Sequence, residues 1–423
     1  MIFKVILPFV IALFSIPAFS LVKWDNPPIH LPKNVAEWLW LEVNANPAEQ
    51  IRRTSDPLHL EHIDIPQRIL KSEIGIGLRP EIYDSLVFES HGEKYIRWIF
   101  NPEDNFYRDQ VIEFVTKATG TTPEIKRKFV GYLTASRSTV VQNPDNGALF
   151  SLKASTAVTG GWWQFKKMTA IAAQISRAYS DYIAKNAPKD HLKSFVALPE
   201  PFAVIAEDID VSFTIRDYPA FTNENIRMIP FFTALHTKYG AELAHELGSE
   251  DPESFWNEHA AEPWGLAMAE ALAYYGFYPN SAHSQDFLVE CDEHRKPTGR
   301  IYARDIMDSD GDEMILKARG AWEVLDIYKH TQKIRSWPGK VLMWAMPFNG
   351  QHAPEWMKKY QFNLKFYEKF IARYSELTGV KGLTVPDNFK DKPLEKEVKE
   401  DPNFLGWIEK IHINNYRCQD FFH

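Results

Sequence analysis

Two aspartates flank a possible pair of strands near the middle of the chain. Asp286 comes directly before the apolar segment 287–290, and Asp305 follows the segment 300–304. If the two segments form a hairpin that turns over residues 292–298, both carboxylates lie at the same end of it. Such a pair suits Mg²⁺, which takes one or two carboxylates together with phosphate oxygens. The spacing therefore predicts that Asp286 and Asp305 bind Mg²⁺.

The same arrangement predicts an electrostatic conflict. Two carboxylates a few ångströms apart repel, so the pKa of one should rise unless a cation offsets the charge. We expect Mg²⁺ bound with a nucleotide to supply that offset, as in protein kinases, where an Asn and an Asp hold the metal. By this argument Asp305→Asn should cost little stability, because the amide relieves the repulsion.

A lysine at the end of an apolar strand is the second candidate feature. Residues 138–155 are expected to form a hairpin, because 143–147 read Asn-Pro-Asp-Asn-Gly between two apolar segments. A buried ammonium needs an anionic partner, so Lys153 should face the same cleft as Asp305 and reach nucleotide phosphates there. The alternative is that Lys153 faces solvent and Asp305 caps a turn. The order and spacing together favour the nucleotide site.

The order of these motifs resembles the ATP site of siderophore synthetases that work independently of peptide synthetases, the aerobactin-synthetase type. That family carries Ser-x-Arg-Thr, a strand lysine, an Arg-Glu-x-Pro-like segment, His-x-Gln-Asn before a strand, and Arg-Asp after the next strand. The resemblance covers roughly residues 130–315. Its segments here are Ser136-Arg137-Ser138-Thr139, Lys153, Arg216-Asp217-Tyr218-Pro219, His283-Ser284-Gln285-Asp286 and Arg304-Asp305.

The resemblance implies a kinase-like, ATP- and Mg²⁺-dependent core. In the family chemistry a substrate carboxylate attacks the α-phosphorus of ATP, and an amine or hydroxyl takes the resulting acyl-adenylate. By the same resemblance His283 and Arg137 are the expected catalytic residues, which neutralise phosphate charge. The residues expected to bind the nucleotide are Ser136, Thr139, Lys153, Arg216 and Gln285.

Three departures from the family pattern bear on the expected chemistry. Ser138 stands where the family has arginine, Asp286 replaces its asparagine, and Ser281 replaces a glutamate two residues before the histidine. The family's N-terminal substrate motifs have no match. Two alternatives to a ligase therefore stay open. One is a phosphotransferase with Asp286 as base near a hydroxyl substrate, and the other is a non-catalytic envelope protein that retains the fold.

Composition indicates a large globular protein. The 423 residues are 45% hydrophobic and 14% aromatic, which is ample for a core. A net charge of -8 argues against a nucleic-acid surface, which is normally basic.

The expected partner is a small-molecule or protein substrate. The predicted fold is α+β, a kinase-like core with an antiparallel sheet and a helical C-terminal region.

The first residues predict export. Lys4 precedes a mostly apolar run over residues 5–16, which is too short to span a bilayer, and Ala18-Phe19-Ser20 supplies small residues for cleavage. We expect residues 1–20 to be a signal peptide, and the mature protein to be periplasmic or secreted without a membrane span. Free ATP is scarce outside the cytoplasm, so the prediction of export and the prediction of an ATP site are difficult to reconcile.

The rest of the chain is expected to divide into three parts. Residues 21–130 would form an N-terminal α+β region, 131–315 the nucleotide-binding core, and 316–423 a helical region with a charged linker at 386–402. Helices are expected over residues 35–43, 104–118, 168–184, 228–238 and 263–275.

Overall fold

The computed structural model describes most of the chain from Pro28 to Gln419. The described residues are 28, 30–45, 57–102, 104–134, 137–157, 165–186, 192–279, 284–331, 334–335, 354–385, 398 and 400–419. The predicted signal peptide lies outside them, as do Ser136, His283 and most of the predicted linker. Those predictions therefore stay predictions.

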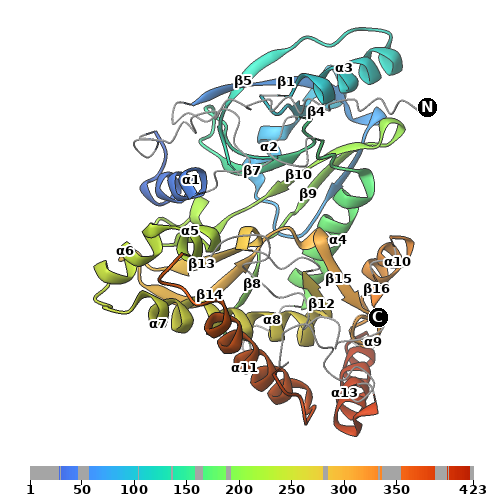
Figure 1. The fold of residues 1–423 in the computed structure, drawn as a ribbon. Coiled ribbons are helices and arrows are strands. Elements are labelled where there is room, and N and C mark those ends of the chain that lie inside the picture. Colours follow the sequence, from blue (N-terminus) through green and yellow to red (C-terminus); the bar gives the residue numbers. More distant parts are fainter. Residues whose placement is uncertain are drawn as a thin grey trace, which may run out of the picture.

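An antiparallel nine-stranded sheet forms the upper half of the molecule in Figure 1. Its order is β2-β9-β10-β7-β6-β5-β1-β4-β3. The predicted boundary at residue 130 falls within β5, so the N-terminal region and the predicted core share this sheet. Its strands are β1 (Leu58–Pro66), β2 (Lys71–Ile74), β3 (Val87–Ser90), β4 (Glu93–Ile99), β5 (Lys126–Leu133), β6 (Ser138–Gln142), β7 (Leu149–Ala154), β9 (Phe202–Ala206) and β10 (Val211–Arg216).

Two smaller sheets and most of the helices form the lower half (Figure 1). The four-stranded sheet has the order β11-β13-β14-β8 and the three-stranded sheet β12-β15-β16. Their strands are β8 (Phe195–Ala197), β11 (Arg227–Pro230), β12 (Phe277–Pro279), β13 (Phe287–Cys291), β14 (Pro297–Ala303), β15 (Ser309–Asp312) and β16 (Ile334–Arg335). The α+β class with an antiparallel sheet is confirmed.

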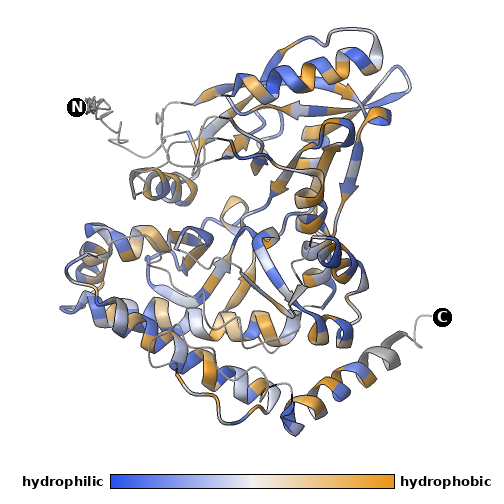
Figure 2. Ribbon diagram, turned by 45° about the vertical axis from the view of Figure 1, so that its right-hand side comes forward, coloured by the Kyte–Doolittle hydropathy of each residue, from blue (hydrophilic) through white to orange (hydrophobic). Residues whose placement is uncertain are grey.

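Helices cover the sheets and make up most of the described C-terminal part, as predicted. Figure 2 shows that their apolar residues lie mainly on the faces turned toward the sheets and toward one another. The helices are α1 (Lys33–Ala45), α2 (Pro80–Leu86), α3 (Asn105–Thr119), α4 (Ala170–Asn186), α5 (Phe231–His236), α6 (Lys238–Glu246), α7 (Pro252–Trp256), α8 (Glu262–Tyr275), α9 (Glu313–Ala318), α10 (Trp322–His330), α11 (Lys359–Thr378) and α13 (Pro402–Gln419).

Local signals place several helix ends where the sequence predicts them. Asp104 caps α3 by accepting a hydrogen bond from the backbone N–H of Tyr107, and Gly120 ends this helix at φ 74°. Gly276 ends α8 in the same way at φ 66°. None of the helices described is both long and apolar enough to cross a membrane.

The prediction of a helix over residues 228–238 is wrong in its first part. Met228 and Ile229 belong to β11 and pair with Glu290 and Val289 of β13. Helix begins only at Phe231, after Pro230. Buried β-branched and apolar residues suit a sheet as well as a helix, so a short apolar run does not distinguish the two.

Buried His62 on β1 makes stability depend on pH. Its exposed fraction is 2%, and burial lowers the pKa of its imidazole from 6.5 to about 4, with Asp64 opposing the shift. Between these two pKa values the unfolded chain binds the proton more readily, so stability falls as the pH falls. From pH 7 to pH 5 this group should cost about 2 kcal/mol. Urea unfolding at pH 7 and pH 5 tests this prediction. Between these pH values the free energy of unfolding of His62→Gln should fall by about 2 kcal/mol less than that of the parent. Equal losses in the two proteins would contradict the prediction.

Candidate functional site

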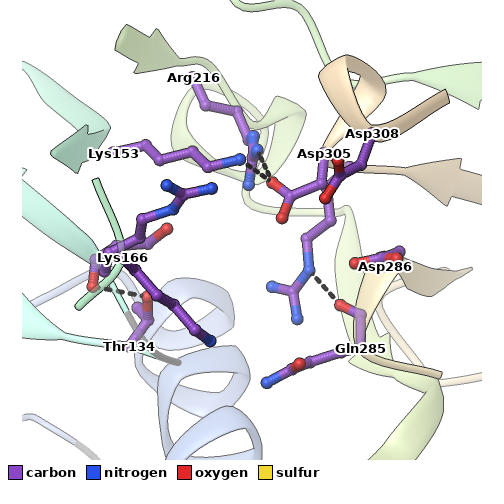
Figure 3. A pocket seen from close by; sticks show the side chains of 11 residues that line it. Thr134, Lys153, Lys166, Arg216, Gln285, Asp286, Asp305 and Asp308 are labelled. Carbon is purple, nitrogen blue, oxygen red and sulfur yellow. Dashed lines mark hydrogen bonds and ion pairs between the residues drawn. The ribbon is translucent and has the colours of Figure 1, made fainter. Parts of the chain in front are cut away.

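A cavity of about 170 Å³ is lined by residues on or next to strands of the nine-stranded sheet and by residues that flank the β13–β14 hairpin. Figure 3 shows that Lys153 and Arg216 point across it toward Asp305, while Gln285, Asp286 and Asp308 lie on the side of Asp305. The cavity therefore brings cationic and carboxylate side chains together. Its lining consists of Thr134, Arg137, Ser138, Lys153, Lys166, Arg216, Gln285, Asp286, Arg304, Asp305 and Asp308.

The β13–β14 hairpin places the two aspartates at one end, as predicted. Phe287 pairs with Ala303, and the backbone N–H of Arg304 donates to the Asp286 carbonyl at 2.8 Å. Asp305 comes one residue later with φ 65°. This left-handed conformation is uncommon, but Asp and Asn adopt it more readily than other residues with a side chain. Both carboxylates line the cavity.

The hairpin of β6 and β7 places Lys153 opposite Asp305. The Lys153 Nζ donates to Asp305 Oδ1 at 2.5 Å, although 152 positions separate the two residues. The lysine side chain is 2% exposed. The prediction that the two residues face the same cleft is confirmed, and the alternative of a solvent-facing lysine is wrong.

Arg216, at the end of β10, holds the same carboxylate from a second direction. Its Nη2 donates to Asp305 Oδ1 at 2.5 Å, and its Nε donates to Glu200 Oε1 at 2.9 Å. Arg216 and Glu200 are both buried. Together with Lys153, they form a network of two cations and two carboxylates. Because both hydrogen bonds to Asp305 end on Oδ1, Oδ2 is the oxygen that another ligand can approach.

The environment drives the pKa values of the two aspartates apart. Burial would raise the pKa of Asp305, but the charges of Lys153, Arg216 and Arg137 hold it well below its usual range. Burial and the charge of Asp305 raise the pKa of Asp286 well above its usual range, with Arg304 opposing. The predicted repulsion is therefore present, and it raises the pKa of Asp286 rather than that of Asp305.

Two more cations lie at the edge of the cavity nearer β6. Arg137 precedes β6, and its Nη1 donates to the Lys167 carbonyl at 2.9 Å. The backbone of Lys166 pairs with that of Thr156 through two hydrogen bonds of 2.8 and 3.0 Å. Both side chains line the cavity. They add positive charge to the cavity wall.

The structure places most of the described residues that the sequence singled out at this cavity. Arg137, Lys153, Arg216, Gln285, Asp286 and Asp305 line it, while their roles stay predictions. Thr139 is 2% exposed and is not part of the lining. Side chains alternate along a strand, so neighbouring Ser138 faces the cavity instead.

Other residues at the site were missed from the sequence. Thr134, Lys166 and Asp308 carry no motif, and only their positions in the fold identify them. Glu200 was missed as well, because it contacts Arg216 and does not line the cavity. The only sequence signal for Glu200 is its place beside Pro199 and Pro201, just before β9.

The donor set fits Mg²⁺ bound together with phosphates. Across the residues described, no group of three or more His, Cys, Asp or Glu side chains is placed to hold a metal. Mg²⁺ commonly takes one or two carboxylates and completes its shell with phosphate oxygens and water. Asp286 and Asp305 supply that number, in a cavity whose cations suit phosphate.

Comparison with known proteins identifies the fold. No protein-family model matches the sequence, and neither does any curated protein. The petrobactin biosynthesis protein AsbB from Bacillus anthracis aligns with 85% of this chain at a TM-score of 0.52 and 13% identity. The aerobactin synthetase IucC from Klebsiella pneumoniae aligns with 83% at a TM-score of 0.53 and 11% identity. The fold is that of the siderophore synthetases.

This likeness confirms, for the fold, the resemblance seen in the ATP-site motifs. The alignments cover 85% and 83% of this chain, whereas the motifs cover less than half of it. The chain itself spans 63% of AsbB and 70% of IucC.

Proposed function

We propose that the protein is an ATP-dependent ligase that activates a substrate carboxylate for attack by an amine or a hydroxyl. The main support for this proposal is that Lys153 and Arg216 both donate hydrogen bonds to Asp305, and that Asp286 lines the same cavity. That arrangement lies within a siderophore-synthetase fold. Positive charge for phosphates and two carboxylates for a metal converge in one cavity, which is what an ATP site requires.

The chain contributes mainly positioning and charge. Arg137, Lys153 and Lys166 would bind the phosphates, and the family pattern assigns His283 to the same task. Asp286 and Asp305 would hold Mg²⁺, which supplies neutralisation of phosphate charge when it is bound. Arg216 keeps the Asp305 carboxylate ionised and oriented.

The proposed reaction has two balanced steps. A substrate carboxylate oxygen forms a bond to the α-phosphorus of ATP, and pyrophosphate leaves with the electrons of the broken bond. The nitrogen or oxygen of the acceptor then bonds to the acyl carbon, AMP leaves, and the acceptor's proton passes to solvent. The predicted export of the protein is a separate proposal, since residues 1–20 lie outside those that the structure describes.

ATP binding and product analysis test this function. Isothermal titration should show that Mg²⁺ alone does not bind measurably, and that it strengthens ATP binding at least about tenfold, because phosphate oxygens complete its shell. With ATP and a panel of mono-, di- and tricarboxylic acids plus amines, the ligase should release AMP and pyrophosphate. Release of ADP would instead support the phosphotransferase, and a protein that binds no ATP would support the non-catalytic alternative.

A further inference from the structure

A glutamate from the N-terminal helix reaches the wall of this cavity. Arg304 Nη2 donates to Glu42 Oε1 at 2.9 Å, across 262 positions of sequence. Glu42 lies on α1 and is 0% exposed, and Arg304 is 8% exposed. Arg304 Nε also donates to the main-chain oxygen of Gln285 at 2.6 Å. Glu42 therefore contacts a residue of the site without lining the cavity.

Helix α1 does not need Glu42 in order to dock. The Asn34 side chain donates hydrogen bonds to the carbonyls of Ala220, Asn223 and Ile226, at 2.9, 3.1 and 2.9 Å. The apolar residues Val35, Trp38 and Leu39 are also buried in one cluster with residues of β11, β13 and β14. Packing and these hydrogen bonds already fix the helix.

Helix stability is also a poor explanation for the buried Glu42–Arg304 pair, because burying two charges has a large desolvation cost. Removing two charges from water commonly offsets their attraction, so a buried pair is weak evidence for stability. Glu42 Oε2 is buried and has no hydrogen-bond partner among the residues described. An unsatisfied buried acceptor lowers stability further. Such local departures from the most stable choice are expected at functional sites.

We propose that Glu42 is a positioning residue of the nucleotide site and acts through Arg304; this inference rests on the proposed function. Glu42 fixes the guanidinium so that Nε holds the main chain of Gln285. The backbone N–H of Arg304 holds the next carbonyl, that of Asp286. The segment carrying Asp286 is thereby held against the residue that precedes Asp305.

A parallel arrangement supports this assignment on the other side of the cavity. Glu200 holds Arg216, and Arg216 holds the Asp305 carboxylate. Glu200 is 0% exposed and its Oε2 also has no partner among the described residues. Arg216 thus holds the Asp305 carboxylate, Arg304 holds the main chain of Gln285 just before Asp286, and a buried glutamate outside the cavity lining anchors each guanidinium.

Glu42→Gln tests the role, with Glu37→Gln as the matched control. Glu37 lies on the same helix and forms an ion pair with Arg227, which is outside the cavity lining. Glu42→Gln should weaken Mg²⁺-dependent ATP binding about tenfold and raise the Mg²⁺ concentration needed for half-maximal binding, as loss of an outer-shell partner does. Glu37→Gln should leave both quantities at the parent value.

A double-mutant cycle with Arg304→Gln separates positioning from general stability. If Glu42 acts through Arg304, the double variant should bind ATP no more weakly than Arg304→Gln alone. Parent-like Mg²⁺ dependence in Glu42→Gln, with only a lower melting temperature, would overturn this inference and leave the proposed function intact. A parent protein that binds no ATP would overturn both.

Discussion

Replacing Lys153 by methionine should lower ATP turnover at least about 100-fold, the size of effect seen when one preorganised donor to a developing charge is removed. Methionine preserves much of the shape of this buried side chain but removes the ammonium that faces Asp305. Among the described residues, Arg216 remains as a hydrogen-bond donor to the Asp305 side chain. The positive charge available to the phosphates and the orientation of the carboxylate both change. The measurement is the release of pyrophosphate from ATP by parent and variant.

Lys167→Met is the matched control for this change. Lys167 contacts the Ile209 carbonyl and Asp210, and its side chain does not line the cavity. The Lys167→Met variant should turn over ATP at the parent rate. Lys153→Met is expected to stay folded, because Arg216 still offsets the Asp305 charge. A folded Lys153→Met that retains the parent rate would rule out a role for Lys153 in ATP turnover.

The strand signals that position the site were readable from the sequence. The turn chemistry of residues 143–147 predicted the hairpin that carries Lys153, and the apolar segments around residues 292–298 predicted the β13–β14 pair. Because antiparallel pairing brings the start of one strand to the end of the next, the proximity of Asp286 and Asp305 followed from local pattern alone.

The partners that set the charges at the site were not readable in this way. Arg216 contacts Asp305 across 89 positions, Glu200 contacts Arg216 across 16, and Glu42 contacts Arg304 across 262. No local pattern specifies such contacts. The sequence therefore predicted the repulsion between Asp286 and Asp305 and placed Lys153 in the same cleft. It did not show that Lys153 and Arg216 both donate to the Asp305 carboxylate and so make Asp305 the ionised member of the pair.

The contacts of Asp305 with Lys153 and Arg216 change the expected result for Asp305→Asn. The repulsion argument predicted little loss of stability, but the variant also leaves Lys153, which is 2% exposed, without its carboxylate. Loss of that partner should lower the free energy of unfolding by about 2 kcal/mol, less than for a fully buried pair because the Asp305 side chain is 29% exposed. Asparagine tolerates the left-handed φ of 65°, so backbone strain does not contribute.

The pH dependence of this loss has a definite sign. The pKa of Asp305 is lower in the folded protein than its ordinary value of 3.8. Its contribution to stability is therefore full above that value and is lost as the pH falls through the folded-state pKa. Urea unfolding of parent and Asp305→Asn should differ most at neutral pH and converge in acid. A difference that does not shrink in acid would contradict the ion-pair explanation.

Ligand binding by the two asparagine variants gives the sharpest test of the site. Asp305→Asn should abolish the Mg²⁺-dependent part of ATP binding, because it removes the charged ligand held by Lys153 and Arg216. Asp286→Asn restores the residue of the family motif and should preserve or improve binding. It should also be at least as stable as the parent at neutral pH, since it removes a carboxylate whose pKa is raised by burial and by Asp305. If both variants bind ATP like the parent, the Asp286–Asp305 pair is structural and the non-catalytic alternative is favoured.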